Sequence, residues 1–218
     1  DENISVSIQL SASDIDGDNL TYSLLSDATN GSITIEGQLA TYVPTDYYYG
    51  ADEFTFQVSD GELTDNASVS LFVNAVNDAP VLATLDNVSF DEDSSGGVTL
   101  SATDIDGDDL TYNVTTGTDI VATLEGTDLS FSAPVDFNGT ENFTVSVTDG
   151  DLTDSQVLTV TIAAVNDAPI AGLGLSGITD ENISVSIQLS ASDIDGDNLT
   201  YSLLSDATNG SITIEGQL

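Results

Sequence analysis

The chain has 218 residues and 38 acidic side chains but no Lys, Arg or His, so its formal net charge is -38. It has no basic groups with which to neutralise phosphate, which excludes nucleic acid and anionic membranes as partners and favours cations. Because Cys is absent as well, the serine, cysteine and zinc hydrolase arrangements lack their essential groups. No apolar run approaches the roughly 18 residues of a membrane span. We therefore expect a protein that is neither an enzyme nor inserted in a membrane.

Internal repeats set the domain organisation. Residues 1–39 and 180–218 are identical, an offset of 180 - 1 = 179. A diverged copy lies between them, since the run Ala-Val-Asn-Asp-Ala-Pro returns after 164 - 75 = 89 positions. Each repeat is thus close to the size of one small domain, and we expect the chain to be an interior piece of a longer array. The predicted domains are a first repeat that lacks its first strand (1–77), a complete second repeat (78–166) and the N-terminal part of a third (167–218).

The first repeat has the pattern of short strands. Apolar and polar residues alternate from Ile4 to Ala12, a period of two that buries one face of a strand. Turn signals such as Asn30-Gly31 separate the later segments. No segment has a helical period. Seven strands per repeat therefore predict an all-β chain of immunoglobulin-like β-sandwiches. The further strands are expected around 20–24, 33–35, 39–43, 54–58, 67–73 and, in the second repeat, 81–90.

A cluster of acidic residues follows the opening strand of every repeat. Asp14, Asp16 and Asp18 place three carboxylates within five residues, and the pattern returns at residues 104–108 and 193–197. Such carboxylates repel one another unless a doubly positive ion lies between them, and the chain has no basic side chain for that role. Calcium prefers oxygen ligands of this kind. The pattern favours a calcium-binding surface protein, with a solvated acidic turn as the alternative.

The order of several motifs resembles that of the bacterial cadherin-like tandem repeats found in large calcium-dependent surface adhesins. These motifs are Asp-Glu-Asn, Asp-x-Asp-Gly-Asp, Gly-Ala-Asp-Glu-Phe, Ser-Asp-Gly and Asn-Asp-Ala-Pro, and together they cover the whole chain. The resemblance implies cadherin-like sandwiches joined by linkers that bind calcium between successive domains. The ligands it implies at the first junction are Glu2, Asp52, Asn77, Asp78, Asp104, Asp106 and Asp149. Those at the second are Glu92, Glu141, Asn166, Asp167, Asp193 and Asp195, while Asp14, Asp16 and Asp60 occupy matching positions of the first repeat.

The linkers depart from the animal cadherin pattern at one position. Ala75 and Ala164 stand where those linkers carry a further acidic residue, two places before the Asn. Each junction therefore loses a carboxylate, and we expect fewer ions per junction than in animal cadherins. Extracellular calcium modules bind at about 10⁻⁴ to 10⁻³ M, which suits fluid outside the cell. Calcium is then expected to convert a hinged array into a rod.

Three functions are compatible with these features. The first is a structural extender on the cell surface, which holds a distal binding domain away from the cell through contacts between adjacent repeats. The second is direct adhesion, in which exposed loops such as Tyr47 to Tyr49 bind surface glycans or a like domain. The third is a filament subunit, in which strands of neighbouring chains complete the first and third repeats. All three place the protein outside the cell.

Overall fold

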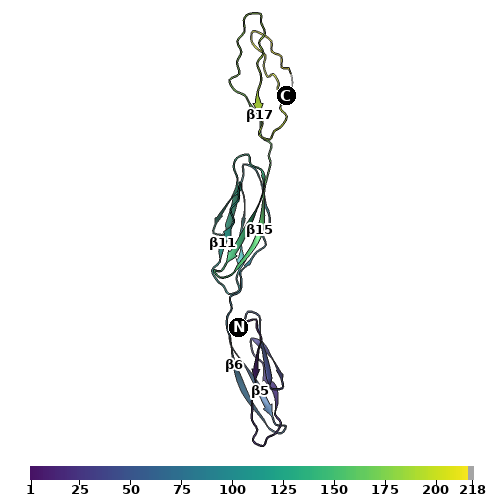
Figure 1. The fold of residues 1–218 in the computed structure, drawn as a ribbon, viewed down its shortest axis with the longest axis vertical. Coiled ribbons are helices and arrows are strands. Elements are labelled where there is room, and N and C mark those ends of the chain that lie inside the picture. Colours follow the sequence, from purple (N-terminus) through teal and green to yellow (C-terminus); the bar gives the residue numbers. More distant parts are fainter. Residues whose placement is uncertain (216–218) are drawn as a thin grey trace. The chain divides into compact units, whose positions relative to one another are not determined.

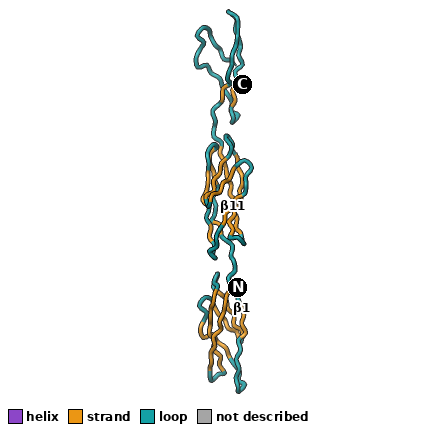
Figure 2. Tube along the Cα trace, turned by 90° about the vertical axis from the view of Figure 1, so that its left-hand side faces the viewer, coloured by secondary structure: helices purple, strands orange, loops and turns teal. Residues whose placement is uncertain are grey.

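The computed structural model describes residues 1–215, and this range contains strands, turns and loops but no helix (Figure 2). The prediction of an all-β chain of tandem immunoglobulin-like sandwiches is confirmed. Each strand expected in the first repeat is present, with bounds shifted by a few residues. The strands of the first repeat are β1 (Val6–Gln9), β2 (Thr21–Ser26), β3 (Gly31–Glu36), β4 (Leu39–Pro44), β5 (Gly50–Ser59) and β6 (Thr64–Val73).

The first repeat forms two sheets with a shared core. One sheet has the order β1-β4-β3 and the other the order β2-β5-β6, in which the long strands β5 and β6 lie side by side (Figure 1). Side chains that alternate along each strand point into the core, as the period of two predicts. Tyr42 of β4 and Phe54 of β5 are almost fully buried. The buried core consists of Leu10, Ala28, Ile33, Ala40, Tyr42, Phe54, Phe56 and Val73.

The second repeat has the same two layers but is divided into nine strands, against six in the first. Its sheets have the orders β12-β13-β9 and β11-β14-β15-β8, with a small sheet of β7 and β10. Phe131 of one layer packs on Phe143 of the other, with ring centroids 5.0 Å apart. The strands are β7 (Val81–Leu82), β8 (Val88–Asp91), β9 (Gly96–Thr99), β10 (Ala102–Thr103), β11 (Thr111–Val114), β12 (Val121–Glu125), β13 (Asp128–Ser132), β14 (Gly139–Thr148) and β15 (Thr153–Ala163).

The strand expected over 81–90 is divided into β7 and β8. Between them the side chain of Gln156 takes the place of backbone pairing. Its amide donates to the carbonyls of Leu82 and Ala83, and its Oε1 accepts the N–H of Leu85. The chain then resumes as β8, which pairs with β15 in parallel.

The third repeat is described as far as residue 215, so the end of the predicted domain 167–218 lies outside the described residues. Its strands are β16 (Ile170–Ala171) and β17 (Ala191–Ser192), which pair antiparallel. None of its described side chains is buried. A sandwich needs apolar faces from two sheets, and the described part of this repeat has only this one short pair. The domain boundaries given above remain a prediction.

The chain divides into two compact units. The first comprises Asp1–Val81 together with Ala102–Thr111 and Val147–Asp154. The second comprises Leu82–Ser101, Tyr112–Ser146 and Ser155–Leu218. Two loops of the second repeat thus belong to the same unit as the first repeat and the linker that follows it. This grouping places acidic residues from distant parts of the sequence within one unit.

One carboxylate in each of the first two repeats holds a loop in place. Asp52 accepts the N–H groups of Thr29 and Asn30 at 2.9 Å, and the Tyr42 hydroxyl donates to it at 3.0 Å. Burial alone raises the pKa of Asp52, but these donors and the N–H of Glu53 outweigh it, so the pKa is lowered. Burial and the contact with Asp52 raise the pKa of Tyr42 to about 12.

Glu141 has the same structural role in the second repeat. It accepts the N–H groups of Thr118 at 2.9 Å, Asp119 at 2.8 Å and Ile120 at 3.3 Å. The bond from Asp119 is the main cause of its lowered pKa. Both carboxylates therefore act as loop braces whose charge is satisfied by the protein itself.

Replacement of Phe54 by Ala should destabilise the first repeat by about 3–5 kcal/mol, because it leaves a cavity between the two sheets. Phe72 on the neighbouring strand β6 is 72% exposed, so Phe72→Ala is the matched control and should cost less than about 1 kcal/mol. Urea unfolding monitored by tyrosine fluorescence measures both. Equal losses in the two variants would contradict the two-layer core.

Asp52→Asn should cost about 2–4 kcal/mol at neutral pH, because a charged acceptor of several hydrogen bonds becomes a neutral amide. The pKa of Asp52 is lower in the folded state, so its contribution is complete above the unfolded value of about 3.9 and is lost as pH falls through the folded pKa. The difference in unfolding free energy between the two proteins should therefore shrink from pH 5 towards pH 2. Glu53→Gln, at the exposed neighbouring position, is the control, and chelator excludes a metal effect. A pH-independent difference would refute this account.

Candidate metal centres

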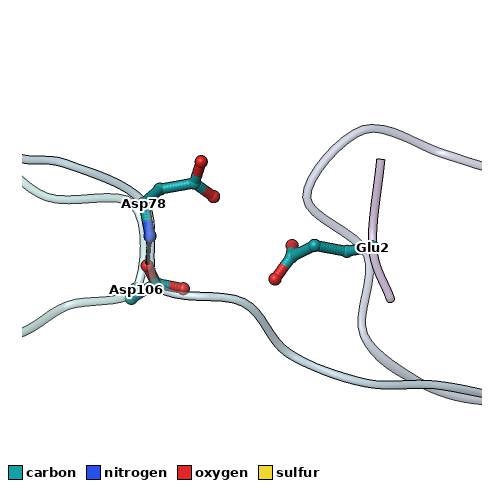
Figure 3. A group of neighbouring side chains, drawn as sticks. All are labelled: Glu2, Asp78 and Asp106. Atoms are coloured by element: carbon teal, nitrogen blue, oxygen red, sulfur yellow. Dashed lines mark hydrogen bonds between the residues drawn. The ribbon is translucent and has the colours of Figure 1, made fainter. Parts of the chain in front are cut away.

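Three carboxylates from distant parts of the sequence converge in the first compact unit. Glu2, Asp78 and Asp106 each offer an oxygen, and these oxygens lie within 4.8 Å of one another. Figure 3 shows the three side chains directed towards the same gap. Glu2 is only 2% exposed, and its Oε1 accepts the N–H of Val76 in the linker. The Asp78 N–H in turn donates to Asp106 Oδ2 at 2.8 Å. Two hydrogen bonds from linker N–H groups therefore hold the linker, one to Glu2 and the other to the acidic turn.

The acidic turn of the second repeat is folded by its first aspartate. Asp104 Oδ1 accepts the N–H groups of Asp106 at 2.9 Å, Gly107 at 3.0 Å and Asp108 at 3.3 Å. Gly107 has a φ of +81°, which is costly for residues with a Cβ. Asp104, Asp106 and Asp108 form a second group of oxygens within 4.8 Å. The turn thus presents carboxylates on one side while its backbone is satisfied by one oxygen of Asp104.

Two carboxylate oxygens in the linker and the acidic turn have no hydrogen-bond donor in the described residues. Asp78 Oδ2 and Asp104 Oδ2 are buried side-chain atoms without a hydrogen-bond partner in the described part of the chain. Burial, then the charges of Asp106, Glu2 and Asp104, raise the pKa of Asp78. Burial and the same acidic turn raise the pKa of Asp108. The protein alone therefore leaves these carboxylates poorly stabilised in their charged form.

The linker is also held by an amide. Asn77 Nδ2 donates to Asp149 Oδ2 at 2.9 Å, and the other oxygen of Asp149 accepts the N–H groups of Asp151 and Leu152 at 2.7 Å. The bond from Leu152, followed by that from Asn77, lowers the pKa of Asp149. Both residues predicted here from the sequence are thus brought together, with Asp149 already well supplied with donors.

The second unit repeats this arrangement. Glu92, Asp167 and Asp195 offer oxygens within 4.8 Å of one another, and Glu92 is 7% exposed. Glu92 Oε1 accepts the N–H of Val165, and Asp195 Oδ2 accepts the N–H of Asp167 at 2.7 Å. Each of these bonds has its counterpart in the first unit. The match over two diverged sequences shows that the repeat itself specifies the geometry.

A further group in the second unit was not predicted. Asp93 and Asp136 approach Asp167 within the same 4.8 Å limit. The corresponding residues of the first repeat are Asn3 and Tyr47, which carry no charge at neutral pH. Burial, then Asp136, raise the pKa of Asp167. The change from Asn3 to Asp93 is visible in the aligned sequences, but the sequence aligns Asp136 with Asp46, and only the matching φ and N–H bond equate Asp136 with Tyr47.

Several predicted ligands lie outside these groups. Asp52 and Glu141 brace loops, as described above, and neither belongs to an acidic group in the described residues. Asp14 folds its own turn as Asp104 does, through bonds of 2.8 to 3.2 Å. Asp60 accepts the N–H groups of Glu62 and Leu63. Asp193 accepts the N–H of Asp197. The Asn166 side-chain amide donates to the Asp167 carbonyl. Asp14, Asp16, Asp60 and Asp193 have no such group around them in residues 1–215.

The donor set fits a hard cation. All of the converging atoms are carboxylate oxygens, and Ca²⁺ takes 6–8 oxygen ligands in flexible geometry. Zn²⁺ and copper favour nitrogen and sulfur ligands that the chain lacks. The orphaned oxygens of Asp78 and Asp104 are the atoms that such a cation would satisfy. The residues present therefore fit calcium.

A model of the bacterial Ig domain matches residues 1–72, 77–161 and 166–218. Chitinase A of Pseudoalteromonas piscicida is 30% identical over 150 residues, which is 66% of this chain and 18% of that protein. Integrin beta-like protein A of Dictyostelium discoideum is 27% identical over 247 residues, or 93% of this chain and 13% of that protein. The chain thus spans less than a fifth of the length of either relative.

Solved cadherin ectodomains are among the similar structures. Domains 1–4 of protocadherin gamma B7 align with a TM-score of 0.49 and 16% identity, covering 88% of this chain and 55% of that one. Domains 1–2 of human protocadherin-24 align with a TM-score of 0.45 and 17% identity, covering 74% and 90%.

Bacterial Ig domains are typically extracellular or surface-exposed structural modules. In the described residues no helix is long and apolar enough to span a membrane. The family model accounts for nearly all of the chain in three consecutive matches. The chain therefore belongs to the bacterial Ig domain family and contains three of its repeats in tandem.

Proposed function

We propose that the chain is a calcium-rigidified extender of an extracellular surface protein or adhesin, placed between the cell and a distal binding domain. The observation that carries this proposal is the convergence of Glu2, Asp78 and Asp106, together with the orphaned oxygens of Asp78 and Asp104. Carboxylates from three segments converge with no basic side chain anywhere in the sequence, so a positive charge at this site must come from outside the protein.

The residues that would hold the ion come from three parts of the first unit. Glu2 lies in the first repeat, Asp78 in the linker, and Asp104 and Asp106 in the acidic turn. Calcium bound there would supply positive charge and coordinate oxygens from all three parts. Because one ion would join them, removing it would break several contacts at once, and the linker would become a hinge.

Repulsion adds to this effect in the absence of calcium. Burial, followed by the charges of Asp106, Glu2 and Asp104, raises the pKa of Asp78, so both effects oppose its ionisation. At neutral pH the group can relieve this repulsion by protonation, by separation of the segments or by binding a cation. A calcium affinity of about 10⁻⁴ to 10⁻³ M, as in other extracellular modules, would keep the site filled outside the cell and empty in the cytosol.

Direct adhesion is a second candidate, favoured by two exposed aromatic side chains. Tyr47 is 50% exposed and Tyr49 is 58% exposed, in a loop held by the bond from the Tyr47 N–H to Asn3. Aromatic faces of this kind can stack on sugar rings. The second repeat has Phe137 but no tyrosine in this loop. Retention on a glycan array, lost in a Tyr47→Ala, Tyr49→Ala variant, would support this role.

The first test of the extender is small-angle X-ray scattering of the chain in 2 mM calcium and in excess chelator. Calcium should lengthen the molecule and narrow its distance distribution, since it restricts the linkers. Magnesium at the same concentration should have less effect, because its preference for near-ideal octahedral geometry suits this flexible set poorly. Identical profiles with calcium and chelator would refute the proposal.

A paired substitution locates the response. Asp104→Asn with Asp106→Asn should weaken calcium binding at the first linker by at least about tenfold, because two charges leave the site while the amide oxygens still fold the turn. Asp14→Asn with Asp16→Asn is the matched control, since the same turn has no acidic group around it in the described residues. Isothermal titration measures the affinity, and circular dichroism verifies folding. Equal effects of the two pairs would contradict the assignment.

A further inference from the structure

The first two repeats each contain one Asn-Gly pair at the start of a strand. Gly31 is the first residue of β3, and Gly139 is the first residue of β14. Asparagine is thermolabile, and it reacts most readily before glycine, because no Cβ shields the glycine nitrogen that attacks its side chain. The reaction needs local motion of the backbone, so the surroundings of each pair decide its rate.

The Asn30-Gly31 pair is partly buried and held by several bonds. The Asn30 N–H donates to Asp52 at 2.9 Å. The Asn30 carbonyl accepts the N–H of Thr45 at 2.8 Å and the hydroxyl of Tyr42 at 3.3 Å. A Cβ added to Gly31 would overlap the ring of Tyr42, so the same tyrosine covers the glycine. The backbone on both sides of the reacting bond is therefore held in place, and this pair should react slowly.

The Asn138-Gly139 pair is less restrained. Asn138 is exposed, and its Nδ2 donates to Glu92 Oε2 at 3.4 Å, a long distance for a hydrogen bond. A Cβ on Gly139 would be 3.0 Å from Phe137 Cζ, which is the far end of a side chain that can move. Asn138 is therefore open to solvent and weakly held, in contrast to Asn30 in the first repeat.

We propose that Asn138 is a site of spontaneous deamidation, which places a new carboxylate beside Glu92. The Gly139 nitrogen attacks Cγ of Asn138 and forms a C–N bond that closes a succinimide ring. The bond from Cγ to Nδ2 breaks, and ammonia leaves with the proton of the Gly139 amide. Water then opens the ring to aspartate or isoaspartate. Water is consumed and ammonia is released, with no change of oxidation state.

The new carboxylate would lie beside an acidic group. Glu92 is 7% exposed, and its other oxygen already accepts the N–H of Val165. The amide of Asn138 supplies Glu92 with a donor, whereas a carboxylate at this position has none, so an attraction becomes a repulsion between like charges. Four acidic residues form groups with Asp167, namely Glu92, Asp195, Asp93 and Asp136. Deamidation would therefore add charge where the second unit already concentrates it.

This inference rests on the proposed function, because it concerns the regulation of the same kind of calcium group. Affinity for calcium depends on the number of charged ligands, so an added carboxylate should strengthen binding. In the absence of calcium the same charge would repel Glu92. Deamidation would thus make the second unit more dependent on calcium as the protein ages. The first repeat has Tyr49 before Gly50 in the matching loop and would not change in this way.

Incubation of the folded full chain at mildly alkaline pH, followed by peptide mapping with tandem mass spectrometry, tests the reaction itself. A glutamate-specific protease suits the chain, which lacks the Lys and Arg that trypsin needs. Its fragments 3–36 and 126–141 separate Asn30 from Asn138. Asn138 should convert at least about tenfold faster, and the two rates should become similar in urea. Equal rates in the folded chain, or no conversion of Asn138, would overturn the proposal.

An Asn138→Asp variant carries the aspartate product and tests its effect on Glu92. In chelator and low salt its thermal midpoint, measured by circular dichroism, should lie about 2–5 °C below that of Asn113→Asp, which has the same charge change at an exposed position of β11. In a Glu92→Gln background the difference should disappear, since the repulsion has been removed. Equal midpoints in the wild-type background, or a difference that persists with Glu92→Gln, would refute the contact.

Isothermal titration with calcium links the modification to the proposed function. The Asn138→Asp variant should bind calcium at least about threefold more tightly than Asn113→Asp, because its added carboxylate lies beside the acidic group. Calcium should also reduce the difference in thermal midpoint between the two variants. Equal affinities would overturn the regulatory role of Asn138. Calcium binding by neither variant would contradict the proposed function instead, and the rates from peptide mapping would still decide the modification.

Discussion

The absence of any basic side chain is the constraint on which the rest of the structure depends. With 38 acidic residues, every carboxylate must be solvated, protonated, bound by backbone donors or neutralised by a cation from outside the protein. Asp52 and Glu141 show the backbone solution, in which several N–H groups converge on one carboxylate and lower its pKa. Asp78 shows the opposite condition, because burial and then its acidic neighbours raise its pKa. A carboxylate thus either stabilises the fold or is available to a ligand, depending on how many hydrogen-bond donors surround it.

The acidic turn combines both solutions in one side chain. Asp104 Oδ1 is consumed by three backbone N–H groups, whereas its Oδ2 is buried without a partner in the described residues. The first oxygen makes the turn rigid before any ion arrives, so little conformational entropy remains to be lost on binding. The second oxygen remains available to coordinate a cation, which would satisfy it. A preformed turn with one unsatisfied oxygen is a better receptor than a flexible run of aspartates of the same charge.

Much of this fold follows from sequence periodicity, and the family resemblance named Glu2, Asp78 and Asp106, which the structure brings together. The period of two located every strand of the first repeat, and burial of Tyr42 and Phe54 follows from the same alternation. Division of the expected strand over 81–90 did not follow, because it depends on the distant side chain of Gln156. The resemblance suggested Asp52 as a ligand, which stays a prediction, and sequence motifs did not indicate that it accepts the backbone N–H groups of Thr29 and Asn30. Side-chain partners that are remote in sequence decide such cases.

The linker shows how one repeat depends on its neighbour. Glu2 of one repeat and Asp106 of the next contribute to a single acidic group, so neither repeat holds the complete set of carboxylates. The diverged group of Glu92, Asp167 and Asp195 keeps the same two bonds from linker N–H groups. A few carboxylates and two backbone bonds therefore define the group, so the rest of each repeat's surface can diverge without changing it.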